Sequence, residues 1–148
     1  TRFDPTLNAA ARCELFLWRA TPEGRLAEIL VLDQFSRNVY RDTARAFAQD
    51  ALALALAQEL VASGQDRNLP TAQRVFAYMP YMHSESALIH EQALELFAQP
   101  GMENNLDFER RHKAIIDRFG RYPHRNAVLG RTSTPEELAF LSGPGSSF

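Results

Sequence analysis

Apolar residues recur along most of this chain at spacings of three and four positions. Leu7, Ala11, Leu15 and Trp18 show the pattern near the start. This spacing gathers apolar side chains on one face of an α-helix. No stretch shows the alternation of apolar and polar residues that marks a half-buried strand. The chain is therefore predicted to be all-α, without a sheet.

The predicted helices are separated by residues that commonly start or end a helix. We expect about seven helices that pack as antiparallel hairpins. Gln49–Leu54 and Glu91–Leu96 share the pattern Ala-Leu-x-Leu, as stacked helical hairpins would. The expected helices are Pro5–Arg19, Pro22–Phe35, Thr43–Ser63, Thr71–Met79, Ser84–Ala98, Asn104–Phe119 and a last one that begins at Thr134–Pro135.

Single residues define several of these helix ends. Gly64 is expected to end its helix in the left-handed conformation, which glycine adopts readily, and Gly120 is expected to end the helix before it. Pro80 is expected to end the helix before it, because proline lacks the backbone N–H that a helix interior needs. Thr134 and Glu137 have the spacing of a capping box, in which each side chain accepts a hydrogen bond from the other residue's backbone.

The composition fits a single globular domain. The chain has 148 residues, 45% of them hydrophobic, and a formal net charge of −2, which argues against a disordered chain and against nucleic acid as a partner. The single cysteine excludes an internal disulfide, and no apolar run is long enough for a membrane span, so we expect a cytoplasmic protein. We expect the domain over residues 1–141 and a flexible tail over 142–148. Because the chain begins at Thr1, we also expect a preceding N-terminal segment to be missing.

Polar residues occupy positions where the helical pattern predicts buried apolar ones. The stripe formed by Leu26, Ile29 and Leu30 continues to Asp33 and then to Arg37. A carboxylate four residues before an arginine can form an ion pair along a helix. Two interpretations remain open, because the pair would either lock this helix onto a neighbour or face a ligand.

A polar connection, Ser36–Asp42, follows this helix. It carries Asn38 and Arg41 between two strongly apolar helices. Loops held by rigid helices often carry binding groups, although a surface turn with an incidental arginine would have the same composition.

A second polar junction, Met79–Glu85, precedes the helix expected from Ser84. His83 would stand just before the N-terminus of that helix, where the helix dipole favours a neutral imidazole that can accept a proton or bind a metal. Glu85 would lie on the first turn with Gln92 on the same stripe, so both would face one partner. Alternatively, Ser84 caps the helix and Glu85 satisfies its free N–H groups.

The densest polar cluster spans Phe119–Arg131 and includes Arg121, His124, Arg125 and Asn126. Its arginines would clamp a carboxylate or phosphate by forked hydrogen bonds, or would tie helix carbonyls and acids into an internal network. A further histidine, at position 112, falls on the apolar face of its helix, where a hydrogen-bonded core histidine is more common than a ligand.

Four segments together resemble a bacterial family known as domain of unknown function 924. They are Leu32–Arg41, Ala44–Ala51, Tyr78–Glu85 and Phe119–Asn126, and they match in order and spacing. The resemblance extends from about Phe3 to Leu141 and implies a tetratricopeptide-like helical superhelix or a compact bundle. The family brings no established activity.

The resemblance also implies which residues belong to the family's motifs. Ser36 departs from the proline usual at its position, which implies a looser turn. The motif positions are Asp33, Gln34, Arg37, Asn38, Arg41, His83, Glu85, Gln92, Arg121, His124, Arg125 and Asn126.

These residues support three hypotheses about function. The first is a binding module with a polar groove for a small anion or a carboxylate-bearing peptide. The second is a hydrolase-like enzyme in which His83 or His124 acts as a general base, Glu85 or Asp33 orients it and arginines stabilise an oxyanion. In the third, the polar motifs are structural and a surface binds a protein partner. No cofactor is expected, since phosphate-loop and dinucleotide motifs are absent, and no metal is expected, since the two-histidine helical spacing is absent.

Overall fold

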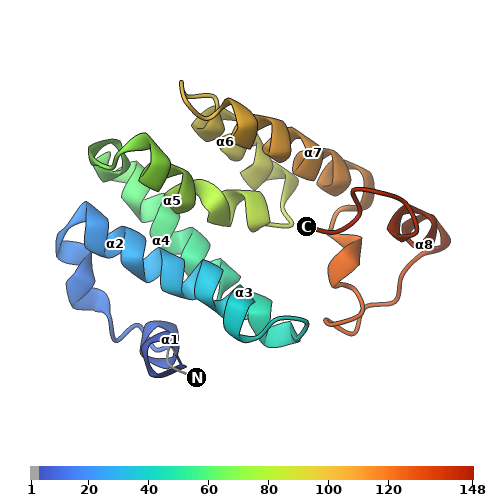
Figure 1. Ribbon diagram of the computed structural model, residues 1–148, viewed down its shortest axis with the longest axis horizontal. Helices are drawn as coiled ribbons and strands as arrows, with labels where there is room; N and C mark the ends of the chain where they lie inside the picture. The colour runs from blue at the N-terminus through green and yellow to red at the C-terminus, as the bar shows by residue number, and fades with distance from the viewer. Residues whose placement is uncertain (1–3) are drawn as a thin grey trace.

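The structure, a computed structural model, describes residues 4–148, which form helices and no strands (Figure 1). The all-α prediction is confirmed for this part of the chain. The helices, with 3-10 and π-helical segments labelled η, are α1 (Asp4–Ala11), η1 (Phe16–Ala20), α2 (Pro22–Leu30), η2 (Val31–Phe35), α3 (Ser36–Val39), η3 (Ala44–Phe47), α4 (Asp50–Ala62), η4 (Gln65–Asn68), α5 (Thr71–His83), α6 (Ala87–Phe97), α7 (Glu103–Phe119), η5 (Pro123–Arg125) and α8 (Pro135–Leu141). Thr1–Phe3, where the expected domain and the resemblance begin, lie outside the described residues.

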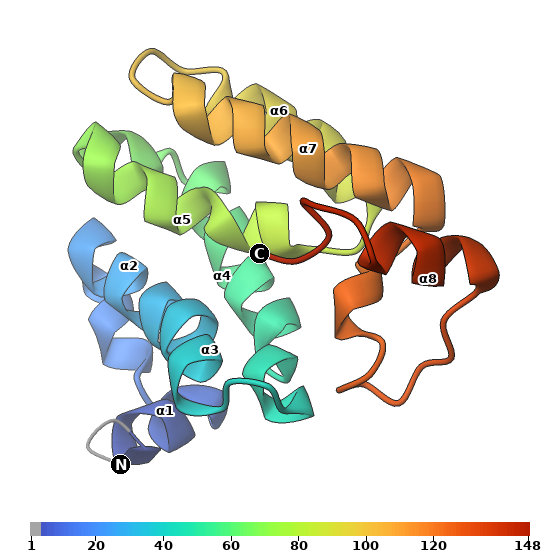
Figure 2. The same ribbon diagram turned by 45° about the vertical axis from the view of Figure 1, so that its right-hand side comes forward.

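Neighbouring helices along the chain also pack against one another in space (Figures 1 and 2). Helix α4 packs on α5, α5 on α6 and α6 on α7, while α2 lies against both α4 and α5. The short helices η5 and α8 lie together beyond the end of α7. Within residues 4–148, no helix combines the length and the apolar character that crossing a bilayer requires.

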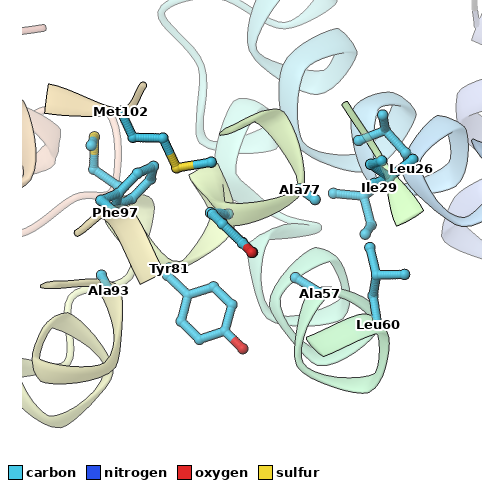
Figure 3. Packing of buried hydrophobic residues seen from close by; sticks show 12 residues of the cluster. Leu26, Ile29, Ala57, Leu60, Ala77, Tyr81, Ala93, Phe97 and Met102 are labelled. Carbon is cyan, nitrogen blue, oxygen red and sulfur yellow. The ribbon is translucent and has the colours of Figure 1, made fainter. Parts of the chain in front are cut away.

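The main hydrophobic core lies where α2, α4, α5 and α6 meet (Figure 3). Ile29, Leu60 and Phe97 are fully buried there, and Ala57 and Ala77 let the helix backbones approach closely. Burying large apolar side chains of this kind stabilises a fold by about 1.5–3 kcal/mol each. This core fixes the positions of α4 and α5, which carry much of the candidate site.

Helix α2 continues without a break through the π-helical turn η2 into α3, since the connecting residues all have right-handed helical backbone angles. The helix predicted to end at Phe35 therefore runs on to Val39. A π-turn inserts one extra residue into the helix and is often found at functional positions. Here it carries Asp33, whose carboxylate is buried.

Several predicted helix ends are confirmed. Gly64 and Gly120 follow α4 and α7 in the left-handed conformation, with φ of 76° and 73°. Thr134 and Glu137 form the predicted capping box at the start of α8.

The prediction of one helix over Pro5–Arg19 is wrong. Helix α1 ends at Ala11, because the chain turns through Cys13 with a left-handed φ of 60°. The Glu14 N–H donates to the Ala9 carbonyl at 2.9 Å and the Cys13 N–H to the Ala10 carbonyl at 3.0 Å, which is the bonding of a Schellman helix end. The predicted buried Trp18 is 37% exposed as a result.

The third predicted helix begins later than expected. The 3-10 turn η3 occupies Ala44–Phe47, and the α-helix starts only at Asp50. This arrangement turns Phe47 and Asp50 toward the candidate site described below.

The prediction that Pro80 ends its helix is also wrong. Helix α5 passes through Pro80 and ends at His83, so His83 lies at a helix C-terminus rather than before an N-terminus. Helix α6 begins at Ala87, where Ser86 and not Ser84 accepts the capping hydrogen bond. The helix dipole near His83 therefore has the opposite sign to the one expected.

The tail after Leu141 lies against the rest of the chain. Ser146 Oγ donates to the Leu141 carbonyl at 3.3 Å, and the Phe148 ring lies 3.9 Å from the His112 ring and 4.5 Å from the His124 ring between centroids. The flexibility expected for residues 142–148 is not tested by these contacts and stays a prediction.

Candidate functional site

A buried carboxylate and a histidine meet where η2 packs beside the end of α5. His83 Nδ1 lies 2.7 Å from Asp33 Oδ1, and Asp33 is 1% exposed. Gln34 Nε2 donates to the other carboxylate oxygen at 2.7 Å. Burial alone would raise the pKa of Asp33, but His83 and Arg37 together hold it below its ordinary value. Asp33 is thus an ionised acceptor, and His83 carries its hydrogen on Nδ1.

Arg37 joins this acid to a second one. Its Nη1 lies 3.1 Å from Asp33 Oδ1 and 2.8 Å from Asp50 Oδ1, while Nη2 donates to Asp50 Oδ2 at 2.9 Å. The predicted ion pair along the helix is therefore present, and Arg37 also ties α3 to the start of α4. Asp50 was not among the candidate residues, although it lies within the segment Ala44–Ala51 that carried the family resemblance.

Arg125 lies beside this pair and is bound differently. It is 5% exposed, and its guanidinium carbon lies over the rings of Phe47 and Tyr122, at 4.4 and 4.8 Å from their centroids. Nη2 donates to the His83 carbonyl at 3.0 Å, and Nη1 is 3.8 Å from Asp50 Oδ2, beyond hydrogen-bond distance. Nε is buried and has no partner among the described residues. Burial lowers the pKa of Arg125 below its ordinary value, an effect that Asp50 opposes.

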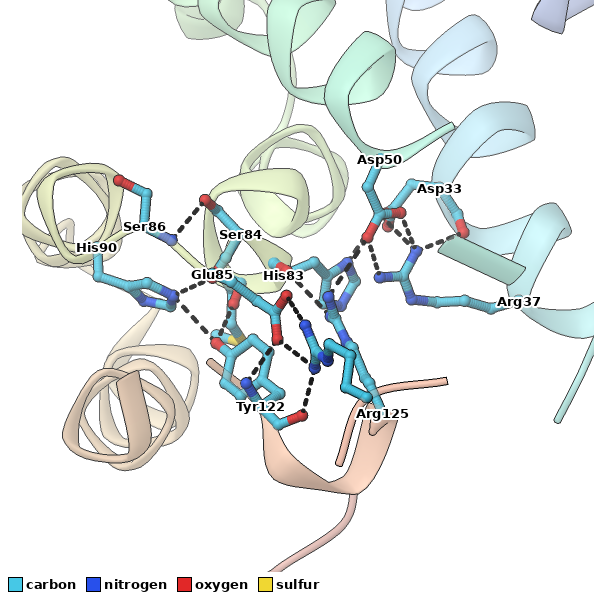
Figure 4. A network of polar contacts seen from close by, with 12 residues as sticks. Asp33, Arg37, Asp50, His83, Ser84, Glu85, Ser86, His90, Tyr122 and Arg125 are labelled. Atoms are coloured by element: carbon cyan, nitrogen blue, oxygen red, sulfur yellow. Dashed lines mark hydrogen bonds and ion pairs between the residues drawn. The ribbon is translucent and has the colours of Figure 1, made fainter. Parts of the chain in front are cut away.

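Figure 4 shows His83 and Arg125 between the acids of α4 and η2 on one side and Glu85 on the other. Glu85 lies in the link between α5 and α6, where it accepts a hydrogen bond from the Tyr122 backbone N–H at 2.6 Å. Arg131 donates to both of its carboxylate oxygens, at 2.8 and 3.0 Å. Burial alone would raise the pKa of Glu85, but Arg131 and the Tyr122 N–H hold it below its ordinary value.

This pairing fastens the segment after η5 to the rest of the fold. Arg131 also donates to Asn126 Oδ1 at 2.9 Å, and Asn126 Nδ2 donates to Ser133 Oγ at 3.1 Å. The candidate residues Glu85 and Asn126 therefore hold the loop in place. Arg131 belonged to the polar cluster in the sequence but was not among the candidate site residues.

Other candidates lie apart from this group. Arg121 forms a fork with Glu137 at 2.9 and 2.7 Å, which fastens α8. Asn38 and Arg41 are exposed. The expectation that Gln92 shares a partner with Glu85 is wrong, because α6 begins after Glu85 and Gln92 faces outward from it.

Two histidines complete the wall of the site. Burial lowers the pKa of His124 to about 4 and that of His112 to about 4, so both rings are neutral at pH 7. His112 Nδ1 donates to the Phe108 carbonyl at 2.7 Å, as expected of a hydrogen-bonded core histidine. His124 Nδ1 is buried without a partner among the described residues.

A further buried pair was missed by the sequence analysis. His90 and Glu109 are fully buried, and His90 Nδ1 lies 2.7 Å from Glu109 Oε2. His90 Nε2 lies 2.6 Å from the Ser84 carbonyl and 3.0 Å from the Tyr122 hydroxyl. The pair therefore ties α6, α7 and the loop after α7 together. The available signal was a histidine within the apolar helix α6, together with an acid on α7. Nowhere in residues 4–148 do three or more histidine, cysteine, aspartate or glutamate side chains gather as a metal ion would require.

Two cavities meet at this group of residues. One of about 400 Å³ is lined by Asp50, His83, Glu85 and Arg125 together with apolar side chains from η3, α4 and α5. The other, of about 290 Å³, lies on the side of His112, His124 and Phe148. Phe47, His83 and Arg125 line both. Of the predicted site residues, the structure brings Asp33, Arg37, His83, Glu85, His124 and Arg125 together at this junction.

The family described as bacterial protein of unknown function (DUF924) matches residues 1–145. The chain belongs to the DUF924 family. The predicted resemblance is thereby confirmed. A search of curated proteins found no match for this DUF924 chain.

A solved structure supports the same assignment. The protein of unknown function ATU0120 from Agrobacterium tumefaciens is 41% identical to this DUF924 chain, with a TM-score of 0.91 over 96% of this chain and 81% of that one. This similarity supports the fold and the family, and it assigns no chemistry to the site.

Chemically, the site combines an oriented imidazole with a partly unbound guanidinium. An imidazole whose Nδ1 is held by a buried carboxylate presents Nε2 for proton transfer or hydrogen bonding. A guanidinium with free donors binds carboxylates and phosphates. Both groups line the same two cavities.

Proposed function

We propose that this DUF924 chain is a binding module that holds a small anion, or a peptide presenting a carboxylate, at Arg125. The observation that carries the proposal is the buried Nε–H of Arg125, which has no hydrogen-bond partner among the described residues, on a side chain that lines both cavities. A buried donor without a partner costs about 1–3 kcal/mol, and an anion in the cavity would offset that cost.

Other partly buried arginines lack this feature. Arg37, Arg121 and Arg131 each direct two nitrogens at the oxygens of one carboxylate. In this proposal their role is structural, because each ties a carboxylate into an internal network. Arg125 has instead one carbonyl partner and a distant acid, which leaves donors for a ligand.

The aromatic rings around Arg125 favour a planar ligand group. The guanidinium carbon of Arg125 lies over the rings of Phe47 and Tyr122, and the donors of a guanidinium lie in its own plane. A carboxylate accepts two parallel hydrogen bonds in such a plane. The cavity beside it, at about 400 Å³, has the size of a small-molecule site.

Thermal melts with benzoate and with inorganic phosphate test the proposal. At a hundred times the dissociation constant, a bound anion should stabilise the wild-type protein by about 2.7 kcal/mol. Arg125→Gln should lose this stabilisation, and Arg125→Lys should keep only part of it, because lysine keeps the charge without the fork.

Arg111→Gln is the matched control, since it removes the same charge from an exposed arginine on α7. It should respond to the anions as the wild type does. Equal stabilisation of the wild type and of Arg125→Gln would contradict the proposal, and so would the absence of any stabilisation by either anion.

A second candidate function, general-base catalysis, is favoured by one specific observation. His83 Nε2 has no hydrogen-bond partner among the described residues, while Nδ1 is held by the buried Asp33. An imidazole so oriented can remove a proton from water or from a bound ligand. If the site is catalytic, His83→Gln should bind the anion but turn over no substrate, and loss of binding alone would favour the binding module.

The tetratricopeptide-like arrangement of the hairpins, a cytoplasmic location and a protein partner also remain proposals. The sequential packing of α4, α5, α6 and α7 supports the first.

A further inference from the structure

We propose that the anion is a monocarboxylate with an apolar body, and that its binding places a proton on His83. This inference rests on the proposed anion site at Arg125 and specifies the ligand and its charge balance. It is carried by the apolar wall of the larger cavity and by the fixed charges around His83.

The wall of the larger cavity is mostly apolar beyond its charged end. Phe47, Leu54, Pro80 and Leu129 line it together with alanines of η3 and α4. A ligand whose carboxylate meets Arg125 would place its remaining atoms against these side chains. Apolar ligand atoms are stabilised when they leave water for such a wall, whereas a second charged group would lose its hydration there.

The fixed charges of the site disfavour a dianion. The two guanidiniums of Arg37 and Arg125 are balanced by the carboxylates of Asp33 and Asp50. Glu85, which also lines the cavity, is balanced by its fork with Arg131. A monoanion therefore leaves one uncompensated negative charge, and a phosphate dianion leaves two. In a site of low polarity such a charge is costly unless a proton accompanies it.

His83 is the group placed to take up that proton. It is faced by Asp33 from η2, Arg37 from α3, Asp50 from α4 and Arg125 from η5. Protonated on both nitrogens, it would donate Nδ1–H to Asp33 and offer Nε2–H to the cavity. It also ends α5, and the C-terminus of a helix favours a cationic side chain.

The neighbouring histidines are less suited to this role. His112 faces His83 from α7 across the smaller cavity, and His124 lies on η5. Burial keeps both rings neutral, with pKa values of about 4. Both are also packed against Phe148.

Calorimetric titration of benzoate and of inorganic phosphate at pH 7.5, each in two buffers of different ionisation enthalpy, tests the inference. The difference between the two buffers gives the number of protons taken up. We expect wild type to bind benzoate at least about tenfold more tightly than phosphate, and to take up as much as about one proton. His83→Gln should bind benzoate about tenfold more weakly and take up none.

The outcomes separate this inference from the proposed function. If phosphate binds at Arg125 as tightly as benzoate does, the inference is overturned, but the proposed anion site at Arg125 is not contradicted. Benzoate binding to the wild type without proton uptake, a result that needs no variant, would also overturn the inference. If Arg125→Gln binds benzoate as the wild type does, the proposed function itself fails. Unchanged proton uptake in a folded His83→Gln would assign the proton to another group and overturn the role of His83.

Discussion

At the residue scale, the partners of each arginine decide what that arginine does. Arg131 and Arg125 are near neighbours in sequence, but Arg131 binds the Glu85 carboxylate whereas Arg125 binds the His83 carbonyl. Arg131 is a structural clamp, because both of its terminal nitrogens reach one carboxylate. Arg125 forms no such fork, because Asp50 lies 3.8 Å from it, so hydrogen-bond donors of Arg125 are left for a ligand in the cavity. Residue type alone does not distinguish the two roles.

Removing the structural clamp should destabilise the fold. We expect Arg131→Ala to lower the free energy of unfolding by about 2 kcal/mol, less than for a fully buried pair because both partners are about one quarter exposed. Urea unfolding measures the change. Arg111→Ala, which breaks an exposed pair with Asp107, should cost less than about 1 kcal/mol. An equal decrease in the free energy of unfolding in the two variants would contradict the structural role of Arg131.

The buried Asp33 should make stability depend on pH in the acid range. Its pKa in the folded protein lies below the ordinary value of 3.8. Its contribution to the free energy of unfolding is therefore fully present at pH values above 3.8, and it is lost as the pH falls through the folded-state pKa. We therefore expect wild type to lose more unfolding free energy than Asp33→Asn between neutral and acid pH. Urea unfolding at a series of pH values gives the free energy of unfolding of each protein. If it fell equally with pH in both proteins, Asp33 would not be the cause of the acid sensitivity.

At the element scale, the sequence predicted helix ends well where a glycine or a capping box marked them. Gly64, Gly120 and the Thr134–Glu137 box all end or start helices as expected. The end of α1 escaped prediction because Cys13 occupies the left-handed position in place of a glycine. At Pro80 the error is the opposite one, since a helix end was predicted and α5 continues past it. In both cases tertiary packing outweighed the local preference of one residue.

The helix end at Cys13 yields a prediction of increased stability. A side chain in the left-handed conformation costs roughly 1 kcal/mol compared with glycine. We expect Cys13→Gly to be more stable than Cys13→Ala by about 1 kcal/mol, since Cys13 is exposed and both variants remove its sulfur atom. Thermal unfolding of the two variants makes the comparison. A less stable glycine variant would show that this turn is not strained.

At the scale of the whole molecule, the candidate site is assembled from four separated segments. The sequence predicted the all-α fold and the segments, because helical periodicity and unusual polar residues are local signals. It did not predict which polar residues meet. Asp50 and Phe47 were missed as site residues because the late start of α4 directs them to Arg125. Gln92 and Arg121 were included although they lie elsewhere, since a pattern cannot show which face of a helix its neighbours cover.

The contrast between Arg125 and the clamped arginines is the central claim, and it can be observed directly. Nuclear magnetic resonance resolves the Nε–H groups of arginine side chains, and the resonance missing from Arg125→Lys identifies that of Arg125. On titration with benzoate, this resonance should shift saturably, whereas those of Arg131 and Arg121 should stay in place because their partners are already bound. A resonance of Arg125 that does not move while benzoate binds, or that moves no more than those of exposed arginines, would contradict the account.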